Sequence, residues 1–220
     1  MLLILASSSI SRFNLINRTG YTPDYTISPN IDETPFKNEL PHKVAIRLAQ
    51  KKAETVYNII MNCNKENNKE SNNENIKEIL VNIEKYNKKL VVLAADTVCA
   101  VGRLILPKAL NETDARFCLN KISGRRHKIH TGVCFIGINP SGKYQVINRI
   151  STTTLLIKQI STKEKDDYIK SKEWMNTAGG YKIEGMISCF VKMISGSENS
   201  NISGLPLSII YPILNYFNSN

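Results

Sequence analysis

The sequence predicts a mixed α/β fold, in which a central mixed sheet is flanked by helices. Two observations predict it. Segments typical of buried strands and of amphipathic helices both occur along the chain, but they do not alternate strictly, as they would in a purely parallel α/β fold. A length of 220 residues with 42% apolar content is enough to build a core, so we expect a single domain over residues 1–220.

The chain begins with an interior strand and a helix. Residues 2–6 are all apolar, which is typical of a strand that is covered on both faces. This run has no basic region before it, so it does not predict a signal peptide. A helix over residues 10–19 follows, with a serine as its N-cap and Gly20 at its end. We expect extended structure over residues 21–29 and then a polar loop over residues 30–35 that carries two carboxylates.

A long helix is predicted over residues 41–60 from apolar residues at helical spacing. These residues are Val44, Leu48, Val56 and Ile59. Lys52 lies on the same stripe. A lysine there either extends its amine to water past the apolar surface or points into a cleft between two lobes, and the stripe alone leaves both readings open.

Residues 62–89 differ from the rest in composition, because Asn, Lys and Glu dominate them. Such a segment buries little apolar area, so it predicts a surface insertion that is disordered at its start. Enough Ile and Leu occur near residues 76–86 for a short helix. We assign no chemistry to this insertion.

In the segment 90–101, a second apolar strand is predicted that begins at residue 90 and ends at Asp96. Six apolar residues precede Asp96, and we expect the buried strand to deliver this carboxylate at its end, as strands often do for an active-site acid. An aspartate in an ordinary strand-end turn is the alternative. Partial desolvation would raise the basicity of Asp96.

The remaining elements are expected in mixed order. They are a helix over 112–122 with Asn111 as its N-cap, a strand over 127–138, a turn at 139–142, a strand over 143–158, a serine-capped helix over 161–171, short strands at 181–185 and 189–194, a loop over 195–207 and a closing helix over 207–217.

Charge and cysteine content narrow the class of protein. A net charge of +10 favours anionic partners, but no dense stripe of cations with interleaved aromatic residues occurs, which argues against a nucleic-acid partner. No apolar run approaches the ~18 residues of a membrane span, so no membrane partner is expected. Five scattered cysteines without a C-x-x-C pair predict reduced thiols in a cytoplasmic protein and no zinc site.

The serine-rich turn after the first strand predicts an anion site. Free backbone N–H groups and the positive end of the helix dipole meet there, and Ser7, Ser9 and Arg12 add donors. A purely structural cap explains the serines alone. Glu33 and Asp96 as carboxylates, together with amines from Lys52 and Lys108, suit a magnesium-bound triphosphate better.

A series of motifs in one order resembles the Maf family of nucleotide pyrophosphatases. In chain order the motifs are Ser7-Ser8-Ser9-Ile10-Ser11-Arg12, Asp32-Glu33-Thr34-Pro35, Leu48-Ala49-Gln50-Lys51-Lys52-Ala53, Ala95-Asp96-Thr97, Pro107-Lys108-Ala109, Ser123-Gly124-Arg125-Arg126-His127 with Thr131-Gly132, Ala178-Gly179-Gly180-Tyr181-Lys182-Ile183-Glu184-Gly185, and Gly204-Leu205-Pro206-Leu207. They span the chain and leave only the Asn-rich segment unmatched.

The resemblance implies two lobes around a cleft, in a fold related to inosine triphosphate pyrophosphatase, and a homodimer. It implies cleavage of a nucleoside triphosphate between the α- and β-phosphates, with Mg²⁺ or Mn²⁺ required, and a role in clearing non-standard nucleotides. The catalytic acid falls on Asp96, and Glu33 falls on a second carboxylate that would share the metal. Lys52 and Lys108 fall on phosphate-contacting lysines. His127 and His130 are expected to serve packing or surface contacts.

The residues that distinguish substrate subfamilies form a mixed set. Arg, Thr and Gln mark a subfamily that acts on thymidine and uridine triphosphates, and Trp, Gln and Glu mark one that acts on 7-methylguanosine triphosphate. Here the residues are Ser11, Thr97 and Glu184. Glu184 accepts hydrogen bonds but donates none when ionised, so base preference stays open. The alternative function is a catalytically weak, nucleotide-binding regulatory protein linked to cell division.

Overall fold

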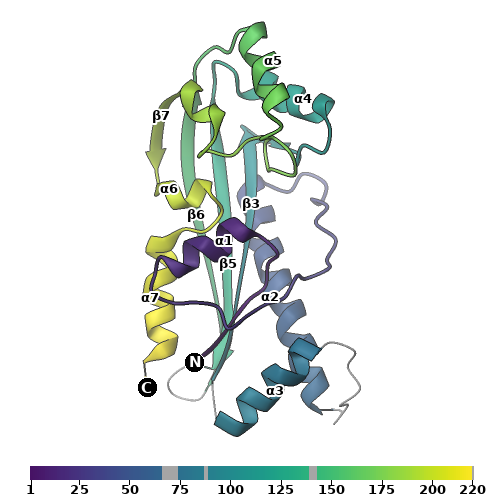
Figure 1. Cartoon of the computed structure of the whole chain (residues 1–220), viewed down its shortest axis with the longest axis vertical. Helices are drawn as coiled ribbons and strands as arrows, with labels where there is room; N and C mark the ends of the chain where they lie inside the picture. Colours follow the sequence, from purple (N-terminus) through teal and green to yellow (C-terminus); the bar gives the residue numbers. More distant parts are fainter. Residues whose placement is uncertain (66–73, 87–88, 139–142, 220) are drawn as a thin grey trace.

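The computed structural model describes residues 1–65, 74–86, 89–138 and 143–219, and its centre is a seven-stranded mixed sheet. The strands lie in the order β2-β1-β3-β5-β6-β7, with β4 paired to β3 (Figure 1). Their bounds are β1 Leu2–Leu5, β2 Tyr25–Thr26, β3 Leu90–Val101, β4 Leu104–Leu106, β5 Arg126–Ile138, β6 Tyr144–Ile157 and β7 Val191–Gly196. β1 runs parallel to β2 and β3, and the other pairs are antiparallel. The predicted mixed sheet is confirmed.

Helices cover both faces of the lower half of this sheet (Figure 1). α1 (Ile10–Asn17) and α7 (Leu207–Asn218) lie on one face, and α2 (Pro41–Lys65) and α3 (Glu74–Tyr86) lie on the other. Successive side chains of a strand point to opposite faces. In β1, Leu2 and Ile4 accordingly pack with α2, whereas Leu3 and Leu5 pack with α1 and α7. An all-apolar strand is therefore the expected consequence of two covered faces.

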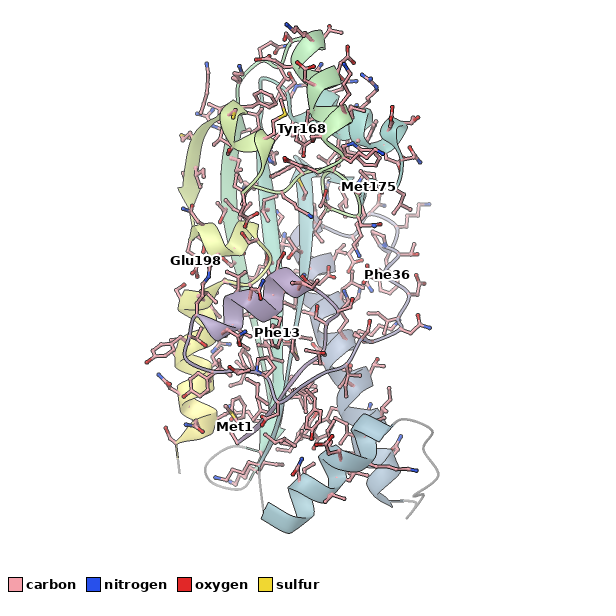
Figure 2. The ribbon with its side chains drawn as sticks, viewed as in Figure 1. Met1, Phe13, Phe36, Tyr168, Met175 and Glu198 are labelled. Atoms are coloured by element: carbon pink, nitrogen blue, oxygen red, sulfur yellow. The ribbon has the colours of Figure 1, made fainter. Side chains whose placement is uncertain are left out.

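A second lobe surrounds the far ends of β3, β5 and β6. It contains α4 (Glu112–Ile122), α5 (Thr162–Ser171) and the 3₁₀ helix η1 (Met186–Phe190), which share one apolar core. Figure 2 shows Tyr168 inside this upper lobe and Phe13 in the lower lobe, on α1. α6 (Asn199–Ile202) lies between the two lobes in the view of Figure 1. The two-lobe arrangement agrees with the prediction.

β3 does not end at Asp96, contrary to the prediction from its apolar run. β5 pairs with β3 from Val91 to Ala100, and Asp96 lies opposite Gly132 within this ladder. The backbone hydrogen bonds of a long antiparallel partner thus carry the strand past its first charged residue.

The segment 181–185 is also not a strand, although its sequence alternates like one. It forms turns after Gly179 and Gly180, whose φ angles of 72° and 74° are left-handed and do not continue a strand. Residues 189–190 belong to η1, and β7 begins only at Val191.

The other boundaries differ by smaller amounts. α2 continues beyond residue 60 to Lys65, α3 begins at Glu74, and α6 interrupts the loop predicted over 195–207. The predicted turn at 139–142 and the predicted disordered start of the insertion, at 66–73, lie outside the described residues. No helix within the described ranges is both long enough and apolar enough to cross a membrane.

Candidate active site

A gap along one edge of β3 creates a cleft between the lobes. On this edge β1 pairs with β3 as far as Leu93, and β4 pairs with it only from Cys99. Within the described part of the chain, residues 94–98 therefore have a strand beside them only on the β5 side. The cleft has a volume of about 610 Å³, which is within the usual range for small-molecule sites.

The cleft gathers every residue that the sequence nominated for the site. They are Ser7, Ser9, Ser11, Arg12, Glu33, Lys52, Asp96, Thr97, Lys108 and Glu184. They come from the turn after β1, α1, the loop before α2, α2 itself, β3, the segment after β4, and the irregular segment before η1. Long-range folding thus joins residues that are separated by much of the chain.

The turn after β1 presents a helix N-terminus to the cleft. The Ser9 hydroxyl is the N-cap of α1 and accepts a hydrogen bond from the Arg12 backbone N–H at 3.3 Å. The Ser7 hydroxyl accepts one from the Ser9 N–H at 3.1 Å. The first N–H groups of a helix have no partner within it. The backbone N–H groups of Ile10 and Ser11 donate to no acceptor in the described ranges, so they are available to bind an anion.

Arg12 joins three of the segments that line the cleft. Its Nε donates to the Gly204 carbonyl at 2.9 Å, its Nη1 to the Ser7 hydroxyl at 3.3 Å and its Nη2 to the Thr97 hydroxyl at 3.2 Å. Burial lowers the pKa of the guanidinium, and the charges of Asp96 and Glu33 oppose that effect. The structure thus gives Arg12 a positioning role beyond the expected contact with phosphate.

Strand periodicity explains why Asp96 faces α2. Val92 and Ala94 pack toward α2 in the core, and Asp96 follows them on the same face. Gly132, directly opposite, lies close to α2, since a Cβ there would come within 2.3 Å of the Ala45 carbonyl oxygen. The close approach brings Lys52 Nζ to 2.5 Å from Asp96 Oδ1, and both side chains are 8% exposed. Of the two orientations predicted for Lys52, the structure shows the one in which its amine points into the cleft between the lobes.

Glu33 forms a bridge across the cleft. One carboxylate oxygen lies 2.6 Å from Lys52 Nζ, and the other lies 2.7 Å from Lys108 Nζ. Burial on its own would raise the pKa of Glu33, but the ion pairs with Lys108 and Lys52 together outweigh it and lower the pKa to about 2. Arg47 of α2 anchors the loop that carries Glu33, because its Nη2 donates to the Thr34 carbonyl at 3.2 Å.

The upper wall of the cleft is irregular and comes from the segment before η1. Lys108 forms a single β-bridge with Ala178, and the Gly179 N–H donates to the Pro107 carbonyl at 3.1 Å. These contacts connect Lys108 to the segment that carries Glu184. The Glu184 carboxylate accepts a short hydrogen bond from Ser203.

His127 and Tyr181 form a buried pair behind this wall. His127 Nε2 lies 2.6 Å from the Tyr181 hydroxyl, and burial lowers the pKa of His127 to about 4. His130 is buried beside Thr152, at 2.9 Å. Both histidines therefore pack within the protein.

Several lining residues were missed by the sequence reasoning. Tyr181, Lys182 and Gly204 lie inside motifs that were recognised, so a signal existed, but no role was assigned to them. Met175, at the lower edge of the upper lobe in Figure 2, lines the cleft from a turn and carries no recognisable motif. A turn residue of this kind enters the site only through tertiary structure.

The donors suit a metal that binds together with phosphate. The described residues include no group of three His, Cys, Asp or Glu side chains placed to hold an ion. Two carboxylates, Glu33 and Asp96, reach the same point from different elements, because both contact Lys52 Nζ. Mg²⁺ commonly takes one or two carboxylates and completes its shell with phosphate oxygens and water.

Comparison with known proteins identifies relatives over nearly the whole chain. The family model described as Maf-like protein matches residues 2–217. A "dTTP/UTP pyrophosphatase" of Wolbachia pipientis wMel is 38% identical over 219 residues, which cover 99% of this chain and 95% of that protein. A protein of Rhodopseudomonas palustris (strain BisB5) with the same name is 38% identical over 205 residues, which cover 93% of this chain and 86% of that protein. A "Nucleoside triphosphate pyrophosphatase" of Orientia tsutsugamushi (strain Boryong) is 37% identical, with 94% and 87% covered.

Among solved structures, a HAM1 protein from Coxiella burnetii aligns with a TM-score of 0.43 and 12% identity, with 98% of this chain and 99% of that chain covered.

Proposed function

The chain belongs to the Maf family, and from this premise we propose that it is a nucleoside triphosphate pyrophosphatase. It hydrolyses a nucleoside triphosphate to the monophosphate and pyrophosphate, with a divalent metal ion. A catalytically weak nucleotide-binding protein is the alternative, and it rests on the replacement of the family's arginine by Ser11.

One observation carries the proposal: two carboxylates and two amines, from distant parts of the chain, meet in one chain of ion pairs. Lys108, Glu33, Lys52 and Asp96 follow one another at 2.7, 2.6 and 2.5 Å. Burying charged groups partly away from water costs free energy. Clusters of such groups are therefore typical of sites that bind or react with charged substrates. A purely structural ion pair would not need four charged groups that span an open cleft from its lower to its upper wall.

The proposed reaction assigns a role to each group. The helix N-terminus, Ser7 and Ser9 bind phosphate oxygens, and Lys52 and Lys108 neutralise the charge that develops on the leaving pyrophosphate. Asp96 orients a water molecule and accepts its proton as the water oxygen attacks the α-phosphorus. The bond between that phosphorus and the bridging oxygen breaks, and the electron pair leaves with pyrophosphate. Arg12 holds the serine turn, Thr97 and Gly204 in place.

A divalent metal, Mg²⁺ or Mn²⁺, would be held by Glu33 and Asp96 together with phosphate oxygens. When bound, it supplies neutralisation of phosphate charge and lowers the pKa of bound water. The low pKa of Glu33, about 2, keeps this carboxylate ionised and able to act as a ligand at neutral pH.

Base preference is proposed to depend on Ser11, Thr97 and Glu184, which all line the cleft. Thr97 is already engaged by Arg12 at 3.2 Å and by Thr131 at 3.1 Å, so its hydroxyl is held in place. Glu184 is exposed on the upper wall, where its carboxylate can accept hydrogen bonds from the edge of a base.

A panel of normal and modified nucleoside triphosphates, each assayed with Mg²⁺ and with Mn²⁺, tests the proposal. Equal amounts of monophosphate and pyrophosphate are expected from at least one nucleotide. Tight nucleotide binding without pyrophosphate release from any of them would favour the regulatory alternative.

Two further properties complete the proposal. A location in the cytoplasm is supported by the free thiols of four cysteines, Cys99, Cys118, Cys134 and Cys189. A homodimer stays a prediction, which light scattering of the purified protein checks.

A further inference from the structure

Lys52 has an unusual position relative to the two proposed metal ligands. Its ammonium group lies 2.6 Å from a Glu33 oxygen and 2.5 Å from an Asp96 oxygen, and its side chain is only 8% exposed. A cation that bridges two carboxylates in this way fills the role that a divalent ion would play there. In the nucleotide-free protein, the counter-ion of this carboxylate pair is therefore part of the chain itself.

The net charge of the cleft favours binding of an anion over binding of a metal ion. The charged lining residues are four cations, Arg12, Lys52, Lys108 and Lys182, and three carboxylates, Glu33, Asp96 and Glu184, with a net charge of plus one. A lone dication would add to an excess of positive charge and would have to compete with Lys52. A triphosphate is a polyanion, so it reverses the sign of the cleft and offers the lysines new partners.

We propose that the nucleotide binds before the metal, because Lys52 neutralises Glu33 and Asp96 until phosphate oxygens take over its ammonium group. This inference rests on the proposed function, since it assigns the same residues to phosphate and metal. Lys108 takes part in the same exchange through the second oxygen of Glu33, at 2.7 Å. Phosphate binding by both lysines frees both oxygens of Glu33.

Titration calorimetry with Mn²⁺ alone, on protein treated with a chelator and then desalted, tests this order. Wild-type protein is expected to bind Mn²⁺ weakly. The Lys52→Met variant keeps both carboxylates and removes their internal counter-ion, so it should bind Mn²⁺ at least about tenfold more tightly. Lys52→Gln serves the same purpose if the methionine variant does not fold. Lys108→Met is the matched control, because it leaves the Lys52–Asp96 pair intact and should show no comparable gain.

A second arm measures the nucleotide without metal. A thymidine triphosphate analogue, with a methylene group between the α- and β-phosphorus atoms, should bind the wild-type protein in the presence of EDTA. Equal Mn²⁺ affinity in wild type and in both Lys52 variants would overturn the inference, as would an analogue that binds only after Mn²⁺. Release of pyrophosphate in the nucleotide panel would leave the proposed function standing in either case, so the two failures are distinguishable.

Discussion

The two walls of the cleft are built in different ways. On the lower wall, Lys52 and Asp96 lie on a long helix and on a strand paired along most of its length, and both are buried. On the upper wall, Lys108 and Glu184 lie on irregular segments and are exposed. The lower wall holds the proposed base, Asp96, and the phosphate-binding Lys52, whereas the upper wall holds the phosphate-binding Lys108 and one proposed base contact, Glu184. Under the proposed function, the acid that must be placed most accurately lies on rigid elements, whereas Glu184 lies where a substitution leaves those elements undisturbed.

The largest effect is expected for Asp96→Asn, on the lower wall. This change removes the proposed proton acceptor but keeps the shape of the side chain, so kcat should fall by about a hundred- to ten-thousand-fold. Binding of a non-hydrolysable nucleotide, measured by calorimetry, should persist. An unchanged kcat would exclude Asp96 as the base and would remove the functional contrast between the walls.

The pH dependence of stability tests the burial behind the upper wall. The pKa of His127 is lowered from 6.5 to about 4 by burial, so the unfolded chain binds this proton more readily. The contribution of neutral His127 to the free energy of unfolding is fully present above about pH 6.5. It falls by roughly 3 kcal/mol as the pH is lowered toward about 4. Denaturant unfolding over this range should show a shallower loss in His127→Gln than in wild type. His130, whose pKa is also lowered to about 4, should keep part of the slope in that variant. Identical slopes would show that His127 is not buried as described.

A glycine substitution tests the rigidity of the lower wall. Gly132→Ala places a methyl group only 2.3 Å from the Ala45 carbonyl oxygen, so it should push α2 away from the sheet and lower the free energy of unfolding by about 1–3 kcal/mol. Because α2 carries Lys52, activity should fall as well. Gly102→Ala is the control: its Cβ meets open space, and only its left-handed φ of 60° opposes the change. A larger loss at Gly102 would contradict the packing account.

The smallest effect is expected on the upper wall, for Glu184→Gln. The amide adds a hydrogen-bond donor at the proposed base contact, so the ratio of kcat/KM for pyrimidine over guanine nucleotides should rise by up to about tenfold. Ser203→Ala removes the hydroxyl that donates to Glu184 and changes no donor pattern on the carboxylate. It should weaken binding of all bases alike. A shift in base preference in Ser203→Ala of the same size would argue against direct readout by Glu184.

Local pattern predicted most of the lower wall. The apolar run of β1, the serine cap of α1 and the apolar stripe of α2 each reflect chemistry within a few residues, and the structure has all three elements. The passage of β3 through Asp96 could not be predicted in this way, because it depends on pairing with β5, far away in the sequence.

The upper wall was harder to predict for the same reason. The segment 181–185 alternates like a strand, but two left-handed glycines precede it and Tyr181 is fixed by His127. Likewise, the motifs nominated Glu33 and Lys108 separately, whereas their ion pair required coordinates. The sequence thus predicted many of the residues that line the cleft, but it did not predict the contacts between the segments that carry them.

The most direct test of the proposed chemistry is a single turnover in ¹⁸O-labelled water with a nucleotide that the protein hydrolyses. Attack on the α-phosphorus by a water molecule that Asp96 orients predicts ¹⁸O in the nucleoside monophosphate and unlabelled pyrophosphate, read by mass spectrometry. Label in the pyrophosphate, or release of orthophosphate in place of pyrophosphate, would contradict the account.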